Sequence, residues 1–495
     1  MSLTRIGKGI RYLIVLNVVQ VAATLIFYSI ISQFLSKDEV GLVTTFTFVY
    51  TILTTLSQLA LPVAGTKYVA EFLSKGEKEK ASTAARSVVR LALLNSSIIA
   101  SGFHIVLFLS MTDFSTMIPF SLVCIASFLA SLKLTYLALV RGLQHFDRVV
   151  IANSSTTITS YIAGVFFVLK FRSMGFTIGI LTGELVGLGL TLLFYYGQFL
   201  KTTSSYDYKT LLKFSLPVFV MQVVVLFSDW ADRILFFAVS LNLAWLGVYD
   251  LTIRSAASLL FIVGFIESIM LPIFTKAYSQ LGKKDVTLLL QRVLRYLGFM
   301  YFPAAFGLAA VSKTVITLLY GPAYIEGAIP LAILSVSSVF MAFSLILGSA
   351  LKSLGKTTAF IKISLASLTV NVIMIVSLTP FIGIIGATLA RIISSFLVFI
   401  LFFHELGGWI NIEIDSDGLW KGLLSSLVSA ALIFCFDALH LSSALINLLV
   451  GTVLGFLSYV VALILLRALR REDFDIFRQI LPLLTPLIDF VERIV

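Results

Sequence analysis

Two acid–base pairs with the same spacing stand inside long apolar segments of this 495-residue chain. Asp229 is followed four residues later by Arg233, and Asp250 is followed four residues later by Arg254. On a helix this spacing brings both side chains to one face, with the acid on the favourable N-terminal side. A charge inside a bilayer costs on the order of a few kcal/mol, so it faces a partner or a wet cavity. We therefore predict that residues 228–255 line a substrate path through a membrane.

Three further ionisable residues in apolar segments extend this candidate site: Asp232, Glu184 and Arg391. Counted from the ends of their spans at a rise of 1.5 Å per residue, they lie with Asp250 and Arg254 in one layer about 9–15 Å below the outer boundary. Guanidinium geometry matches phosphate oxygens, so a wet cavity here would suit an anionic substrate. Structural pairing between neighbouring helices is the alternative, and the sequence leaves both open. Lys133, in another span, is predicted to extend toward the cytoplasmic interface.

Composition places these charges in a membrane protein. Hydrophobic residues make up 59% of the chain and charged residues only 12%, with a mean hydropathy of +1.03. A soluble chain of this length would need more charge, and repeated apolar runs of about 20 residues indicate transmembrane helices. We predict an all-α polytopic membrane protein. The net charge of +11 is attributed to cytoplasmic loops that meet anionic membrane lipids, and no nucleic acid is expected.

The apolar runs predict about fourteen spans. They are 10–35, 41–64, 87–110, 115–140, 149–169, 175–199, 212–240, 244–271, 294–319, 327–349, 358–380, 383–404, 418–439 and 442–466. With this count, 28 of the 36 basic residues fall on one set of alternate loops and termini, and 4 fall on the other. The positive-inside rule therefore predicts that both termini are cytoplasmic.

Short similarities recur along the chain in the same order. Leu61-Pro62 is repeated at Leu271-Pro272, residues 138–144 resemble 350–356, and a turn at Gly175 resembles one at Gly383, all at nearly the same offset. An offset of six spans preserves orientation and predicts two parallel six-helix repeats. Glu184 and Arg391 are equivalent within a residue under this repeat. The predicted domains are a lobe at 1–200, a linker at 201–213, a lobe at 214–405, two additional helices at 406–470 and an interfacial amphipathic tail at 471–495.

Several motifs carry a resemblance to a known family. The second span ends in Leu61-Pro-Val-Ala-Gly65, the centre holds Phe214-Ser-Leu-Pro217 and Asp229-Trp-Ala-Asp-Arg233, and later comes Leu319-Tyr-Gly-Pro-Ala-Tyr324. Over residues 1–405 the chain resembles the multidrug/oligosaccharidyl-lipid/polysaccharide (MOP) exporter superfamily, and within it the Wzx-type flippases of polysaccharide biosynthesis. The resemblance implies two six-helix lobes that form a V around a cavity, as in the MATE exporters. It also implies transfer of an isoprenoid-pyrophosphate-linked oligosaccharide to the outer leaflet.

The sequence therefore predicts a multi-pass transporter of the cell membrane and not an enzyme, with no catalytic residues, no metal site and no cofactor. The expected partners are the lipid-linked oligosaccharide, membrane lipids, polysaccharide-assembly proteins and a coupling ion, H⁺ or Na⁺. Two related functions stay open: a cation-coupled multidrug exporter using Asp229 or Asp232, and a flippase for the peptidoglycan lipid precursor. A membrane-embedded glycosyl- or acyltransferase is a third alternative, although the short outer loops leave little room for its active site.

Overall fold

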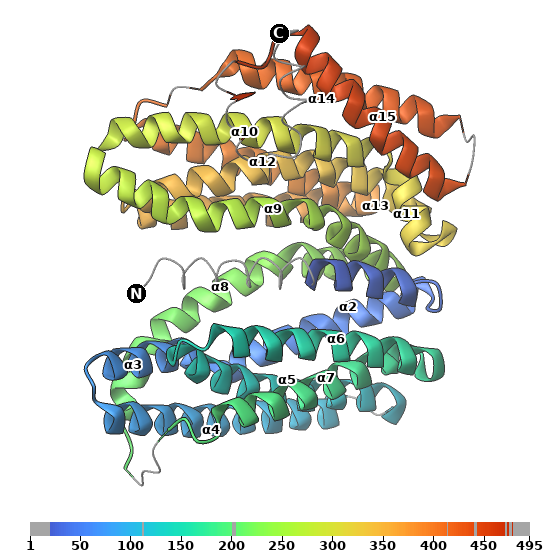
Figure 1. The fold of residues 1–495 in the computed structure, drawn as a ribbon. Helices are drawn as coiled ribbons and strands as arrows, with labels where there is room; N and C mark the ends of the chain where they lie inside the picture. The colour runs from blue at the N-terminus through green and yellow to red at the C-terminus, as the bar shows by residue number, and fades with distance from the viewer. Residues whose placement is uncertain are drawn as a thin grey trace. The chain divides into compact units, whose positions relative to one another are not determined.

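The computed structural model describes residues 20–110, 113–199, 204–412, 414–439 and 443–470, together with residues 473, 474 and 478. Within these ranges the chain forms helices and no strand (Figure 1). The start of the first predicted span and most of the predicted amphipathic tail 471–495 lie outside the described residues.

The described residues contain twelve helices that are long and apolar enough to cross a membrane. Two facts account for the difference from the predicted fourteen spans. The helix over 357–407 holds two predicted spans, since Ile382 and Gly383 interrupt its helical backbone. The first predicted span is described only from Gln20, and its helix Gln20–Ile31 is too short to be counted. The protein is a multi-pass, all-α membrane protein, as the sequence predicts.

The chain divides into two compact units. Unit 1 comprises the described residues up to 237 and residues 241–250, and unit 2 comprises residues 238–240 and the described residues from 251 onward. Unit 1 therefore includes most of the eighth helix and the first residues of the ninth. The predicted domain limits, with lobes at 1–200 and 214–405, stay predictions.

Helices fill both units. In unit 1 they are α2 (Lys37–Gln58), α3 (Leu61–Ser74), α4 (Lys78–Ser110), α5 (Phe114–Gly142), α6 (Phe146–Phe171), α7 (Ser173–Tyr195) and most of α8 (Tyr208–Ser240). Those mainly in unit 2 are α9 (Leu243–Leu281), α10 (Lys283–Ala310), α11 (Ser312–Tyr320), the 3₁₀ helix Pro322–Gly327, α12 (Ala328–Ser353), α13 (Thr357–Gly407), α14 (Ser416–Ala438) and α15 (Ala444–Leu465).

The second predicted span of unit 1 is broken into α2 and α3. Leu59 and Ala60 adopt left-handed backbone conformations, with φ of 48° and 53°, and this ends the hydrogen-bond ladder of α2. The amide of Asn95 on α4 donates to the carbonyl oxygens of Leu56 and Ser57, each at 2.8 Å. A buried carbonyl without a donor is costly, so Asn95 stabilises this break from a neighbouring helix.

The two last helices pack within unit 2. Arg295 on α10 forms buried ion pairs with Asp415, just before α14, at 3.0 Å, and with Asp473, beyond α15, at 2.7 Å. The hydroxyl of Tyr459 on α15 also donates to the carbonyl of Phe299 on α10 at 2.7 Å. These contacts fasten α14 and α15 to α10, which Figure 1 shows running beside them in unit 2.

Matching turns in the two units define the internal repeat. Arg172 between α6 and α7 has φ 54° and ψ −135°, and Gly383 within α13 has φ 55° and ψ −132°. Gln144 and Gly355 form a second pair, with φ of 64° and 76°. Their amides donate three residues back, to the carbonyls of Arg141 and Lys352, at 2.8 and 3.0 Å. The two members of each pair are separated by the same number of residues. We call the alignment of unit 1 with unit 2 at this separation the repeat register.

This register corrects two predictions. The sequence aligns Gly175 with Gly383, but the structural equivalent of Gly175 is Gly386. A Cβ on Gly175 would clash with the main chain of Phe167, and a Cβ on Gly386 would clash in the same way with Leu378. The predicted equivalence of Glu184 and Arg391 is likewise wrong by one helical turn. In the repeat register, Glu184 corresponds to Ser395.

Candidate functional site

Arg233 joins α8 and α9 at the centre of the predicted site in unit 1. Its Nε donates to Oδ1 of Asp250 at 2.6 Å, and its Nη1 lies 3.5 Å from Oδ1 of Asp232. It also donates to the main-chain carbonyl of Asp229 at 3.0 Å. Both carboxylate partners are buried, whereas 13% of the Arg233 side chain is exposed. The carboxylate closest to Arg233 therefore belongs to the next helix and not to the residue four positions earlier.

A close helix contact brings α2 to this charge cluster. A Cβ on Gly41 of α2 would lie 2.0 Å from the carbonyl oxygen of Leu243, and one on Gly247 of α9 would lie 2.6 Å from the carbonyl of Lys37. Only glycine permits this approach. It allows Thr44 on α2 to donate its hydroxyl to Oδ2 of Asp250 at 3.1 Å.

Glu184 lies in a second buried charge cluster of unit 1. Its carboxylate contacts Nζ of Lys133 on α5 at 2.9 and 3.0 Å and accepts a hydrogen bond of 2.8 Å from the hydroxyl of Tyr50 on α2. Lys133 and Glu184 are 5% and 3% exposed. The prediction that Lys133 extends to the interface is wrong, because a buried carboxylate on α7 satisfies its ammonium group.

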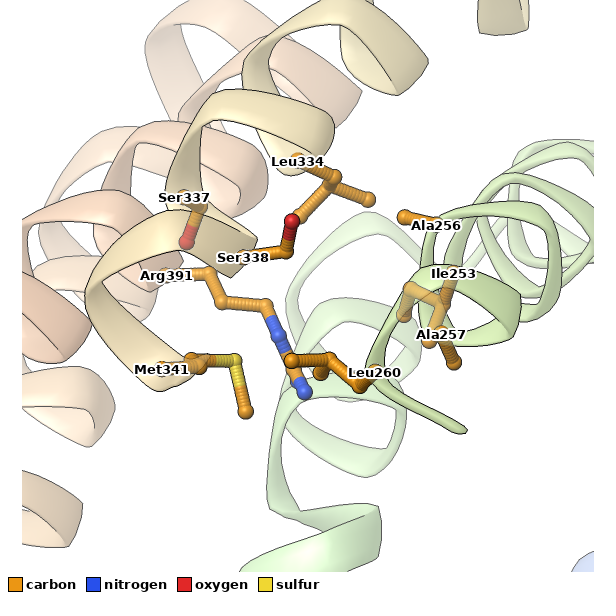
Figure 2. Close-up of a pocket in the computed structure, with 9 residues that line it drawn as sticks. All are labelled: Ile253, Ala256, Ala257, Leu260, Leu334, Ser337, Ser338, Met341 and Arg391. Atoms are coloured by element: carbon orange, nitrogen blue, oxygen red, sulfur yellow. The ribbon is translucent and has the colours of Figure 1, made fainter. Parts of the chain in front are cut away.

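Arg391 lines a pocket within unit 2, where α9, α12 and α13 meet (Figure 2). The other lining residues are Ile253, Ala256, Ala257, Leu260, Leu334, Ser337, Ser338 and Met341. Among these nine residues Arg391 carries the only charge, and the two serines add hydroxyl groups to an otherwise apolar wall. The pocket therefore combines one guanidinium with an apolar surface. A guanidinium in such a wall can pair with an anionic group.

The predicted site residues thus divide into three groups. Asp229, Asp232, Arg233 and Asp250 cluster in unit 1, and Glu184 belongs to a separate cluster there with Lys133. In unit 2, Arg391 lines the pocket and Arg254 is half-buried on α9, next to the lining residue Ile253. Contact with substrate stays a prediction for each residue.

Sequence reasoning missed Lys133 and Tyr50 as partners of Glu184. The available signal was that Lys133 and Glu184 are single charges, each within its own apolar span, but nothing local shows that two such charges meet. No group of three or more His, Cys, Asp or Glu residues in the described ranges has the arrangement of a metal site.

A family model described as "Polysaccharide biosynthesis protein" matches residues 30–330, which is more than half of the chain. The chain belongs to this family. It is also 22% identical over 284 residues to the probable low-salt glycan biosynthesis flippase Agl15 of Haloferax volcanii, a match that covers 57% of this chain and 60% of the relative. The chain thus spans less than two thirds of this relative's length.

Two solved structures share the fold. The lipid II flippase MurJ, in an inward closed conformation, has a TM-score of 0.68 at 15% identity, covering 94% of this chain and 98% of MurJ. An inward-facing multidrug resistance MATE family transporter of the MOP superfamily has a TM-score of 0.64 at 14% identity, covering 79% of this chain and 97% of the transporter. These matches confirm the predicted resemblance and the MATE-like fold.

Proposed function

We propose that this protein is a flippase that moves a lipid-linked oligosaccharide, carried on an isoprenoid pyrophosphate, from the cytoplasmic to the outer leaflet. Membership of the polysaccharide biosynthesis family carries this proposal. The relative Agl15, itself described as a probable glycan biosynthesis flippase, supports it. Alternating access of the two predicted lobes would expose the sugar to one side at a time while the lipid tail stays in the bilayer.

The arginines have different roles in the proposed mechanism. Arg233 sits against the buried carboxylates of Asp232 and Asp250, so a phosphate must compete with two anions for it. Arg391 lines the pocket of unit 2, whose other lining residues are uncharged, and a phosphate there would meet a guanidinium against a largely apolar wall. Because it lines a pocket, Arg391 is our candidate for contact with the pyrophosphate, and we assign to Arg233, which contacts two carboxylates, a role in arranging α8 and α9.

The proposal is tested with purified protein in vesicles that contain a lipid-linked oligosaccharide and a leaflet-specific probe. We expect protein-dependent transfer, and a loss of tenfold or more in rate for Arg391→Ala, because each charge-assisted contact is worth about 1.5–3 kcal/mol. Arg391→Lys should restore part of the rate, since it keeps the charge without the planar guanidinium. The same transfer rate is measured for Arg233→Ala and Arg254→Ala.

Parallel vesicles separate this function from its alternatives. One set carries the peptidoglycan lipid precursor, and another carries a fluorescent cationic drug with a proton or sodium gradient. Transport of the precursor alone, or of the drug alone, would replace the proposal with the corresponding alternative. Full transfer of the oligosaccharide by all three arginine variants would exclude the cationic site. Accessibility of cysteines placed at the two termini tests their predicted cytoplasmic position.

A further inference from the structure

The ammonium groups of two lysines lie near one aromatic ring in unit 2. Nζ of Lys356 lies 3.4 Å from the centroid of the Trp409 ring, and Nζ of Lys283 lies 5.9 Å from it. The three residues come from separate parts of the chain: Lys283 opens α10, Lys356 precedes α13, and Trp409 follows the end of α13. We call these three residues the basic–aromatic cluster.

The packed core of unit 2 holds the three segments of this cluster together. Val286 on α10, Leu354 after α12, and Leu406 and Ile410 around the end of α13 belong to one buried apolar cluster. Each of these residues lies within three positions of a member of the basic–aromatic cluster. The two ammonium groups and the indole are therefore held near each other by well-packed elements.

Carboxylates do not neutralise these two ammonium groups in the described part of the chain. Neither Lys283 nor Lys356 forms an ion pair there, whereas the nearby Lys352 pairs with Glu267 at 2.7 Å. Glu405, four residues before Trp409, accepts the indole N–H at 3.2 Å and is engaged at the ring edge. The cluster therefore presents two positive charges beside an indole that is 38% exposed.

This cluster lies where apolar spans end. Lys283 is the first residue of α10, Lys356 lies in the turn between α12 and α13, and Trp409 lies just beyond the last turn of α13. Tryptophan is enriched at the membrane–water interface, and lysines close to a span end attract anionic headgroups. On the topology predicted from loop charge, this end of unit 2 is cytoplasmic.

We propose that the basic–aromatic cluster binds the phosphate of an anionic phospholipid as a site separate from the substrate path. The two ammonium groups would contact the phosphate oxygens, and the indole would lie along the glycerol backbone. The site is independent of which substrate the protein moves. It would fix the position of this end of unit 2 at the membrane surface.

Lipid retention tests the proposal with the full-length protein. Protein purified from nanodiscs of phosphatidylcholine with a quarter phosphatidylglycerol is compared by native mass spectrometry with the Lys283→Gln/Lys356→Gln double variant. We expect at least a fivefold lower fraction of protein that retains phosphatidylglycerol in the double variant. Trp409→Leu, which keeps both charges, should lower retention by a smaller factor.

A matched control separates a site from a general effect of charge. The Lys75→Gln/Lys80→Gln variant loses the same net charge from the α3–α4 region of unit 1, where both lysines pair with glutamates, and it should retain the lipid as the wild type does. Equal loss in both double variants, or no loss in the Lys283/Lys356 variant, would overturn the proposal. Displacement of the lipid by millimolar inorganic pyrophosphate would overturn the choice of phospholipid and assign the site to the substrate headgroup. Identical elution from gel filtration establishes that the variants are folded.

Discussion

An equivalent helix contact in units 1 and 2 is made by different side chains, charged in unit 1 and neutral in unit 2. In unit 1 the contact between α5 and α7 contains the buried ion pair of Lys133 and Glu184. In the repeat register, the equivalent positions in unit 2 are Ser344 and Ser395, whose hydroxyls bond to main-chain carbonyls one turn earlier on their own helices. The repeated scaffold therefore does not require charge at this contact. The ion pair is an addition specific to unit 1.

Removing one partner of this ion pair gives the largest expected effect, and copying the neutral arrangement of unit 2 should reduce it. Glu184→Ser alone would leave the ammonium of Lys133 buried without its carboxylate, and we expect a loss of about 3–5 kcal/mol in the free energy of unfolding. The double variant Lys133→Ser/Glu184→Ser removes both charges and should lose less than half as much. Unfolding in mixed micelles of increasing SDS fraction measures both. A double variant as unstable as the single one would show that the ion pair itself is needed.

Asn95 marks a second difference between the units. In the repeat register its position in unit 2 is Phe306, whose side chain has no hydrogen-bond donor, and α9 continues as one helix past Pro272. We expect Asn95→Asp, which keeps the size but removes the donor, to cost about 1–3 kcal/mol in unfolding free energy. At the Ser57 carbonyl, Ser96→Ala removes only a longer contact, at 3.4 Å, and it should cost less. The same SDS titration checks both, and equal losses would contradict the role assigned to Asn95.

The matched turns at Arg172 and Gly383 allow backbone strain to be tested by substitution in both units. Gly383→Ala should destabilise unit 2 by about 1–2 kcal/mol, because a Cβ is strained at this φ and ψ. Arg172 occupies the same conformation in unit 1 and pairs with Glu39 at 2.6 Å, which raises the pKa of Arg172. Arg172→Gly relieves the backbone strain while removing the ion pair, so it should be more stable than Arg172→Ala. Thermal unfolding compares the three variants, and the reverse order would exclude strain at Arg172.

The smallest effect concerns an ion pair at the end of α3. The hydrogen bond from Lys75 to Glu71, at 2.6 Å, lowers the pKa of the Glu71 carboxyl below its usual value. Its contribution to stability is therefore present at neutral pH and is lost as the pH falls through that lowered pKa. We expect Lys75→Gln to raise the pKa of Glu71 toward its ordinary value. Carboxyl-carbon NMR titration measures the shift, and an unchanged titration would show that the pair is not formed in solution.

Most spans could be predicted from the sequence because a bilayer requires long apolar helices, and each span carries that signal locally. The break in α13 was also predictable, since Gly383 separates two apolar runs of sufficient length. The repeat register could not be predicted, because positions with the same residue type in the two units do not always have the same backbone conformation. Arg172 adopts the backbone conformation that glycine adopts in unit 2, and its residue type hides the equivalence.

The partners of the charged residues were less predictable than their positions. The spacing of Asp229 and Arg233 predicts one shared helix face, yet Arg233 reaches the carboxylate of Asp250, because α8 and α9 pack side by side there. Lys133 and Glu184 are 51 residues apart and meet only through the packing of α5 against α7. Such contacts depend on how helices are arranged, and a single sequence carries little information on that arrangement.

The broken second span also bears on how this protein is made. The carbonyl of Ser57 obtains its donor from Asn95, which the ribosome adds 38 residues later. When the second span first enters the bilayer, no amide of the third span is present to satisfy the interrupted backbone, and lipid offers none. The segment must therefore enter as an unbroken helix or wait beside the translocon until its neighbour arrives. The two hydrogen bonds from Asn95 therefore link the final conformation of the second span to the arrival of the third.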